Sequence, residues 1–179
     1  MINFWANKGI VRAELARELS LDEVMKIKKN VNIEIQIQVH GFTSIFHSKR
    51  KLLTSYLSHL ERENIEELIK DELFLKEHKR PDNRYPIIED NQGTHIMSDQ
   101  EICMINYIPQ IINAKIDSIK IEGVLHQTDY LVKVTEIYRQ AIDKSYAGEC
   151  IDGLDEQIMA IQPKNRPLGT GFYFKEQIY

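Results

Sequence analysis

Apolar residues alternate with polar ones from Ile33 to Val39, and this period of two predicts a strand. The alternation stops at His40 and Gly41, and a basic, amphipathic helical pattern follows from Lys49 to Leu60. We therefore expect a strand that ends at His-Gly and opens into a helix. In α/β folds such junctions share one rim, where ligands meet the protein.

The rest of the chain alternates between short strand and helix patterns. Ser20 and Glu23, and again Ser98 and Glu101, have the spacing of a capping box, which predicts that a helix starts at each pair. The expected strands lie at 9–17, 33–39 and 117–123, and the expected helices at 21–30, 49–60, 65–69, 102–112, 128–145 and 154–161.

The middle of the chain is charged and has a weaker pattern. A turn is expected at Pro81-Asp82-Asn83, and a hairpin over 85–97 around Asn91-Gln92-Gly93. We interpret 62–98 as a charged excursion that ends in this hairpin. By its size, the whole of 1–179 is expected to form a single domain.

The order of elements predicts an α/β fold with a mainly parallel sheet. It supplies about four parallel strands, whereas a closed (β/α)8 barrel needs eight and typically takes about 250 residues. The chain is therefore either a small open sheet or one part of a larger TIM-like barrel.

Composition narrows the function classes. Hydrophobic residues make up 42% and charged residues 28% of 179 positions, as in soluble globular proteins. The net charge of -4 excludes a polycation, so any nucleic-acid contact needs a local basic patch. The two cysteines, Cys103 and Cys150, form no CxxC motif, which indicates a reducing, cytoplasmic setting without a disulfide framework or a metal knuckle. Neither a run long enough for a membrane span nor a signal-peptide pattern is seen.

Five candidate catalytic residues lie at predicted strand ends. Arg17 and Glu18 follow a strand; they either bind an anionic group or form an ordinary loop ion pair. His40 is either a functional residue, as a general acid or base or as a hydrogen-bond donor to a phosphate or carboxylate, or a structural histidine. Lys120 and Glu122 alternate with isoleucines and form either a proton-transfer pair or a structural ion pair.

The best basic patch includes Lys49, Arg50 and Lys51, and 76–80 holds a second one. Cations at a helix start oppose the helix dipole, so they do not serve helix stability there. They either contact nucleic-acid phosphates or form a solvated surface. Phe42 and Phe46 are either stacking partners for bases or core residues.

Several motifs together resemble peptidase family U32. The matching residues are Arg17–Glu23 (Arg-Glu-Leu-Ser-Leu-x-Glu), Val39–Gly41 (Val-His-Gly), Asp117–Gly123 (Asp-Ser-x-Lys-Ile-Glu-Gly), Val134, Tyr138, Arg139, Ala141 and Asp143, and the closing Arg166–Phe174. The resemblance covers nearly the whole chain, and it implies the C-terminal half of that family's barrel.

The chain departs from the family's signature, which runs Glu-x-Phe-x-x-Gly, then Cys, then Gly-x-Cys. The residues at those places are Gln36, Gln38, Gly41, Ser44, Lys49 and Lys51, so only the glycine is kept. The resemblance implies an iron–sulfur cluster in cysteine-bearing members, but Ser44 and Lys51 cannot replace thiolates as ligands. We therefore expect no cluster and no metal in this chain.

The resemblance implies a cysteine-poor subunit for prephenate-dependent hydroxylation of the tRNA wobble uridine, giving 5-hydroxyuridine. Its expected partners are tRNA and a cysteine-bearing paralogue that holds the iron–sulfur cluster. One alternative is a peptidase, or collagenase-like protease, although neither a Gly-x-Ser-x-Gly nor a His-Glu-x-x-His motif is present. Another is a non-catalytic subunit that binds or assembles, for example as a homodimer.

Overall fold

The computed structural model describes residues 1–69 and 73–175. These residues form two compact units. The first, which we call the sheet unit, comprises Met1–Gly41 and the described residues from Gln100 onward. The second, the hairpin unit, comprises Phe42–Asp99. Each unit is described by itself below.

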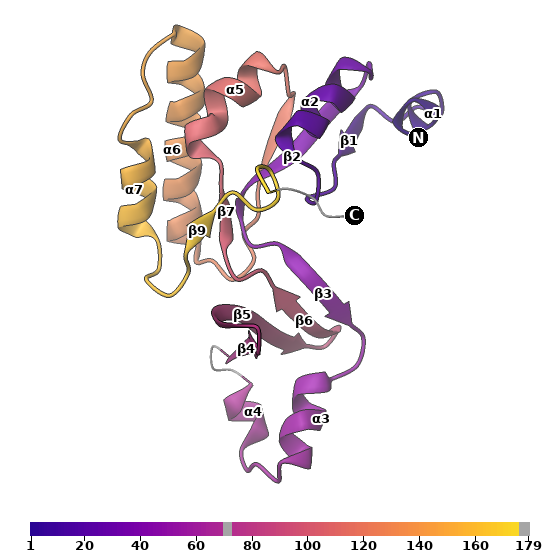
Figure 1. Cartoon of the computed structure of the whole chain (residues 1–179), viewed down its shortest axis with the longest axis vertical. Coiled ribbons are helices and arrows are strands. Elements are labelled where there is room, and N and C mark those ends of the chain that lie inside the picture. The colour runs from indigo at the N-terminus through magenta and orange to yellow at the C-terminus, as the bar shows by residue number, and fades with distance from the viewer. Residues whose placement is uncertain (70–72, 176–179) are drawn as a thin grey trace. The chain divides into compact units, whose positions relative to one another are not determined.

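The sheet unit is built on one mixed sheet (Figure 1). Its strands are β1 (Arg12–Glu14), β2 (Glu34–Gly41), β7 (Glu101–Cys103), β8 (Ser118–Ile121) and β9 (Leu168–Gly169). Strand β2 pairs in parallel with β1 and with β8, and antiparallel with β7, which in turn pairs in parallel with β9. The predicted parallel pairing of the first two strands is therefore confirmed.

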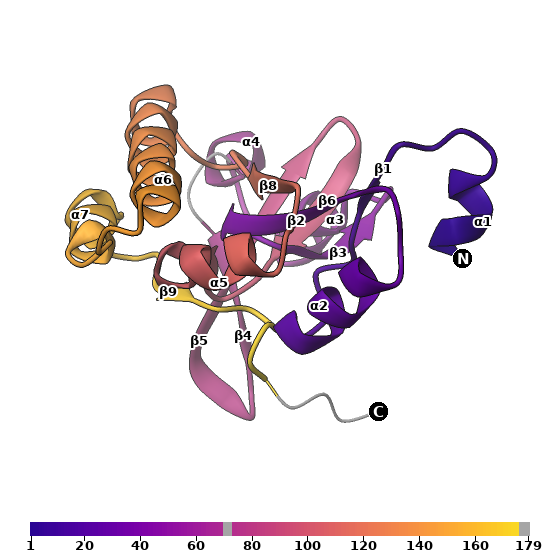
Figure 2. The ribbon, with the colours of Figure 1, turned by 90° about the horizontal axis from the view of Figure 1, so that it is seen from above.

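The helices of the sheet unit, apart from α1, contribute buried side chains to a core with β2. The full set is α1 (Ile2–Ala6), α2 (Leu21–Lys29), the 3-10 turn η1 (Ile105–Tyr107), α5 (Ile108–Asn113), α6 (Thr128–Ala147) and α7 (Leu154–Ile161). Helices α6 and α7 lie side by side, and α1 lies beyond β1, far from them, in both ribbon views (Figures 1 and 2).

The core of the sheet unit follows from the alternation in β2. Ile35, Ile37 and Val39 are at most 1% exposed and pack with apolar residues of α2, α5, α6 and α7. Each such fully buried aliphatic side chain contributes about 1.5–3 kcal/mol relative to an exposed one. The opposite face of the parallel strands carries polar side chains instead.

Local signals explain where α2 begins and where α6 ends. The capping box at α2 is confirmed: Ser20 Oγ accepts a hydrogen bond from Glu23 N, and the Glu23 carboxylate accepts one from Ser20 N. Helix α6 ends at Gly148, whose φ of 73° is in the left-handed region that glycine adopts readily.

The hairpin unit contains an antiparallel sheet in the order β3-β6-β5-β4. Its elements are β3 (Ser44–Ser48), α3 (Leu52–His59), α4 (Ile65–Leu68), β4 (Leu73–Glu77), β5 (Arg80–Asp90) and β6 (Gly93–Met97). The predicted hairpin around Asn91-Gln92-Gly93 is confirmed, with Asp90 opposite Gly93. Residues 70–72 of the expected excursion lie outside the described residues.

Three local predictions are wrong because long-range pairing overrides them. The chain does not pass from His40-Gly41 into a helix, since β3 comes first and pairs with β6. Ser98 and Glu101 do not cap a helix, because Ser98 Oγ accepts from Thr43 N and Glu101 begins β7. Pro81 lies inside β5, and the turn comes before it, at residues 78–79.

The architecture is thus mixed α/β, with both parallel and antiparallel strands. Strands β1, β2 and β8 supply three adjacent parallel strands rather than four. No closed barrel is formed by the described residues.

Candidate functional site

Four charged side chains meet on the polar face of the parallel strands, and we call them the rim cluster. They are Glu14, Arg17, Lys120 and Glu122. Lys120 Nζ lies 3.0 Å from Glu14 Oε1 and 3.3 Å from Glu122 Oε2. Arg17 Nη2 lies 3.9 Å from Glu122 Oε2, the longest of the three contacts. The side chains are between 22% and 41% exposed, so solvent and ligands can reach them.

Strand register brings this cluster together. Gln38 of β2 is opposite Lys120 of β8, and Gln36 is opposite Ser118. Gln36 links the strands, since its Nε2 donates to Glu14 and its Oε1 accepts from Ser118 Oγ. Polar side chains of three neighbouring strands therefore share one face.

The charges in the rim cluster determine what it can do. Hydrogen bonds to Glu14 and Glu122 raise the pKa of Lys120, although partial burial acts against them. Lys120 is therefore protonated at neutral pH, where it can hold an anion but cannot act as a base. The two carboxylates balance the two cations, so an anionic ligand must compete with them.

Gly41 allows the backbone around Glu122 to approach the end of β2. Glu122 N donates to His40 O at 2.9 Å, and a Cβ on Gly41 would lie only 2.2 Å from Glu122 O. Gly41 also has a φ of 94°, which L residues rarely adopt. A side chain at this position would displace Glu122 from the rim cluster.

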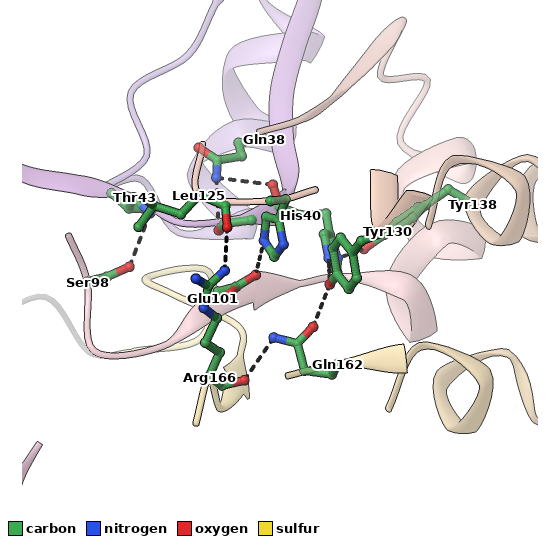
Figure 3. Close-up of polar contacts among 12 residues, drawn as sticks. Gln38, His40, Thr43, Ser98, Glu101, Leu125, Tyr130, Tyr138, Gln162 and Arg166 are labelled. Atoms are coloured by element: carbon green, nitrogen blue, oxygen red, sulfur yellow. Dashed lines mark hydrogen bonds and ion pairs between the residues drawn. The ribbon is translucent and has the colours of Figure 1, made fainter. Parts of the chain in front are cut away.

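A second group of polar side chains is buried against α6 (Figure 3). His40 is fully buried, and its Nε2 lies 2.7 Å from the Tyr130 hydroxyl. That hydroxyl donates to Gln162 Oε1 at 2.5 Å, and Gln162 Nε2 donates to Arg166 O at 2.8 Å. At the solvent-exposed end of this group, Arg166 Nη1 donates to Leu125 O at 2.6 Å. We call this chain of contacts the buried network.

The buried network fixes the tautomer of His40. Because Gln162 donates through Nε2, its Oε1 must accept, and the Tyr130 hydroxyl uses its only proton to fill that role. The Tyr130 oxygen can then only accept from His40, so the histidine proton is on Nε2. Burial, and to a lesser degree the charge of His126, lower the pKa of His40 to about 4. His40 is a neutral hydrogen-bond donor here.

Two further buried groups extend this region. His126 Nε2 lies 2.7 Å from Glu101 Oε2, and both side chains are at most 1% exposed. The His126 ring stacks on Tyr130 with ring centroids 4.1 Å apart. The Tyr138 hydroxyl donates to Val39 O and accepts from Met104 N, which secures α6 to the end of β2.

The structure brings some of the predicted site residues together and separates others. Arg17, Lys120 and Glu122 share the rim cluster, which also contains Glu14, a residue that sequence reasoning missed. Glu18 is exposed and lies outside the ion pairs found among the described residues. His40 belongs to the buried network. Tyr130 carried no motif signal. Tyr138 was noted only as part of a family motif, and Glu101 only as part of a predicted helix cap, so their position beside His40 is seen in the structure alone.

Lys49, Arg50 and Lys51 are exposed in the hairpin unit, in the turn between β3 and α3. Phe42 is buried, whereas Phe46 is 46% exposed.

The cysteines do not form the donor set of an iron–sulfur cluster. Cys103 is partly buried in β7, where burial raises the pKa of its thiol, and Cys150 is exposed after α6. Among the described residues, no group of three or more His, Cys, Asp or Glu side chains is placed to hold a metal ion. Two thiols are too few for the four ligands that such clusters use.

In the part of the chain that the structure describes, no helix combines the length and the apolar character needed to cross a membrane.

Comparison with known proteins relates this chain to one family. It is 44% identical to tRNA hydroxylation protein P2 of Bacillus subtilis, over 99% of this chain and 59% of that protein. It is 33% identical to an uncharacterized protease of Methanocaldococcus jannaschii, over 95% of the chain and 43% of the relative. It is 30% identical to tRNA hydroxylation protein P1 of Bacillus subtilis, over 79% and 34% respectively.

The chain thus spans less than two thirds of the length of these relatives. No solved structure matches it. The model of peptidase family U32 matches residues 1–178. From this match and the 44% identity we conclude that the chain belongs to peptidase family U32.

Proposed function

We propose that this chain is a cytoplasmic, cysteine-poor subunit in the hydroxylation of tRNA. The observation that carries the proposal is the 44% identity, over 99% of the chain, to a protein named for tRNA hydroxylation. The reaction we assign is the prephenate-dependent conversion of the wobble uridine to 5-hydroxyuridine, as the family resemblance implies.

The rim cluster is our candidate for recognition of the small substrate. Arg17 and Lys120 offer two cations on an accessible polar face, which suits an organic acid such as prephenate. The loose Arg17–Glu122 contact, at 3.9 Å, is the one that an incoming carboxylate would most easily replace. Glu122 would then be left beside Lys120, where it can orient that lysine or exchange a proton with the substrate.

The parallel strands support the proposal that this chain is one part of a larger TIM-like barrel. Among the described residues, β1 and β8 each pair only with β2, so each has an edge that another strand can join. We propose a cysteine-bearing paralogue as the partner, with a homodimer as the alternative. Bacillus subtilis has relatives of this chain named P1 and P2, which is consistent with paired paralogues.

In this proposal the paralogue supplies the iron–sulfur cluster, because the donor set of this chain does not fit one. The chain's own contribution is to bind and position substrates through the rim cluster and the basic turn after β3.

A peptidase is the second candidate, favoured by the relative described as a protease. A cysteine nucleophile needs a lowered thiol pKa, whereas burial raises the pKa of Cys103. His40 does not support a serine mechanism either, because its Nε2–H is engaged with Tyr130. The local chemistry therefore favours the tRNA proposal.

The test is deletion of the gene followed by mass spectrometry of nucleosides from bulk tRNA. We expect 5-hydroxyuridine and its derivatives to fall, and to return when the gene is restored on a plasmid. An unchanged 5-hydroxyuridine level would contradict the proposal. Release of peptides from casein or gelatin by the purified protein, lost in Glu122→Ala, would instead favour the peptidase.

A further inference from the structure

We call the turn that carries Lys49, Arg50 and Lys51 the basic turn. Hydrogen bonds from neighbouring side chains fix its backbone. Arg50 N donates to Ser48 Oγ at 3.2 Å, and Arg50 O accepts from Thr94 Oγ1 at 2.9 Å. Lys51 O accepts from Ser55 Oγ at 2.7 Å. The three cationic side chains are exposed, so a fixed backbone presents them to solvent.

Gly93 permits this placement of the basic turn. A Cβ on Gly93 would lie 1.9 Å from Ser48 O and 2.8 Å from Lys49 Cα. Only glycine allows the start of β6 to come this close to the end of β3, and its φ of 126° is also one that other residues avoid.

The cations are not needed by the helix that follows. Glu89 satisfies the start of α3, because its carboxylate accepts from Leu53 N at 2.8 Å and from Thr54 N at 3.3 Å, and also from the Thr54 hydroxyl. Burial alone would raise the pKa of Glu89, but the hydrogen bonds from Thr54 and Thr94 hold it below its usual value. Three cations beside this helix start oppose its dipole, so their presence requires another reason.

An exposed apolar stripe continues from the basic turn along α3. Leu52 is 39% exposed, Tyr56 61% and Leu60 44%, and their spacing of four residues places them on one helix face. Leu53, by contrast, is buried. We call this stripe the outer face of α3. Three exposed cations therefore directly precede a helix face that carries an accessible aromatic ring.

We propose that the basic turn and the outer face of α3 bind unpaired nucleotides of an RNA. The cations contact phosphates, and a base stacks on Tyr56 with Leu52 and Leu60 beside it. Proteins recognise RNA loops in this way, because unpaired bases expose faces that a duplex hides. The inference rests on the proposed function for its RNA, and it names an unpaired loop, rather than a paired stem, as the part that this surface binds.

The first test measures binding of the purified full chain to a fluorescein-labelled RNA hairpin with an unpaired loop, and to a blunt RNA duplex, by anisotropy. We expect Tyr56→Ala to weaken hairpin binding about tenfold, because the stacked base is lost, and to leave duplex binding within about twofold. Tyr56→Phe keeps the ring and should bind as the parent does. The matched control is Tyr146→Ala, which removes another exposed tyrosine, from α6.

The second test is the salt dependence of hairpin binding. Replacing Lys49, Arg50 and Lys51 together by Gln should reduce the slope of log K against log salt by about 2, since each lost phosphate contact on a single strand lowers it by about 0.7. The control replaces Lys29, Lys133 and Lys164, which are also exposed, by Gln. It changes the net charge equally and should leave most of the slope intact.

Several results would overturn the inference. In one, Tyr56→Ala and Tyr146→Ala behave alike; in another, the two triple variants do. A third is that the parent chain binds vesicles containing phosphatidylserine but not the hairpin, which would assign the surface to a membrane. The binding test is independent of the deletion experiment: unchanged 5-hydroxyuridine would refute the proposed reaction while the hairpin measurements still decide the RNA contact.

Discussion

The Nε2 of His40 lies 2.7 Å from the hydroxyl oxygen of Tyr130, so a strand residue and a helix residue ninety positions apart share one buried hydrogen bond. Replacing Tyr130 by Phe leaves the His40 donor and the Gln162 acceptor without this partner. We expect the free energy of unfolding to fall by about 1–3 kcal/mol, the cost of buried polar groups that lose their partners. Urea denaturation measures it. Tyr146→Phe, at an exposed position, should change it by less than about 0.5 kcal/mol. Equal effects of the two variants would contradict the buried network.

Stability should depend on pH through His40. Its pKa is about 4 in the folded chain against the ordinary value of 6.5, so between these values the unfolded chain binds more protons. The free energy of unfolding should therefore fall as the pH falls, by about 2 kcal/mol between pH 7 and pH 5. Urea denaturation at a series of pH values measures this. His40→Gln should flatten the dependence, whereas His59→Gln, at an exposed histidine of α3, should leave it in place.

Gly41 should tolerate no side chain. Gly41→Ala adds a Cβ 2.2 Å from Glu122 O at a φ of 94°, and we expect a loss of about 3 kcal/mol from the sum of backbone strain and overpacking. The matched control is Gly148→Ala, which has a φ of 73° but open space around the new Cβ, and should cost about 1 kcal/mol. Thermal unfolding compares the two. If they cost the same, Gly41 is not needed for the close approach of Glu122.

Lys120 should matter for activity more than for stability. Lys120→Met leaves Glu14 and Glu122 without their shared cation. In the proposed function it also removes a binding group for the organic acid. Because the cluster is partly exposed, we expect less than about 1 kcal/mol of destabilisation. In a deletion strain that carries the variant, 5-hydroxyuridine in tRNA should fall about tenfold, equivalent to one lost charge-assisted hydrogen bond. Lys133→Met, at an exposed position of α6, should restore the modification fully.

Glu89 should stabilise the start of α3. Glu89→Gln weakens its hydrogen bonds to the backbone of Leu53 and Thr54, and we expect a loss of about 1 kcal/mol, as for other N-terminal caps. Amide hydrogen exchange at these two residues should become faster. Since the pKa of Glu89 is lowered, the parent should lose this stabilisation as the pH falls and Glu89 becomes protonated. Glu66→Gln, at an exposed position of α4, should change neither measurement.

Features that depend on neighbouring residues could be predicted from the sequence. The capping box of Ser20 and Glu23 joins groups three residues apart, so the sequence contained the whole interaction. The alternation from Ile33 to Val39 likewise predicted β2 and the face that it buries. Helices α2, α6 and α7 lie close to where the sequence predicted them, and α2 also had a start signal in its capping box.

The same local signals failed where a distant segment competed for the same groups. Ser98 and Glu101 have the spacing of a cap, but Thr43 uses Ser98 and β7 pairs with β2 through Ile102 and Gly41. Strand β3 has no clear alternation, and it exists because β6 supplies its hydrogen bonds.

For the candidate site, the sequence by itself identified Arg17, Lys120 and Glu122 as residues near strand ends, and offered two roles for His40. Only the tertiary structure added Glu14 to the first group and joined His40 to Tyr130. The physical reason is the range of the interactions. Caps and side-chain periods involve residues a few positions apart, whereas the rim cluster and the buried network require strands and helices about a hundred positions apart to pack together.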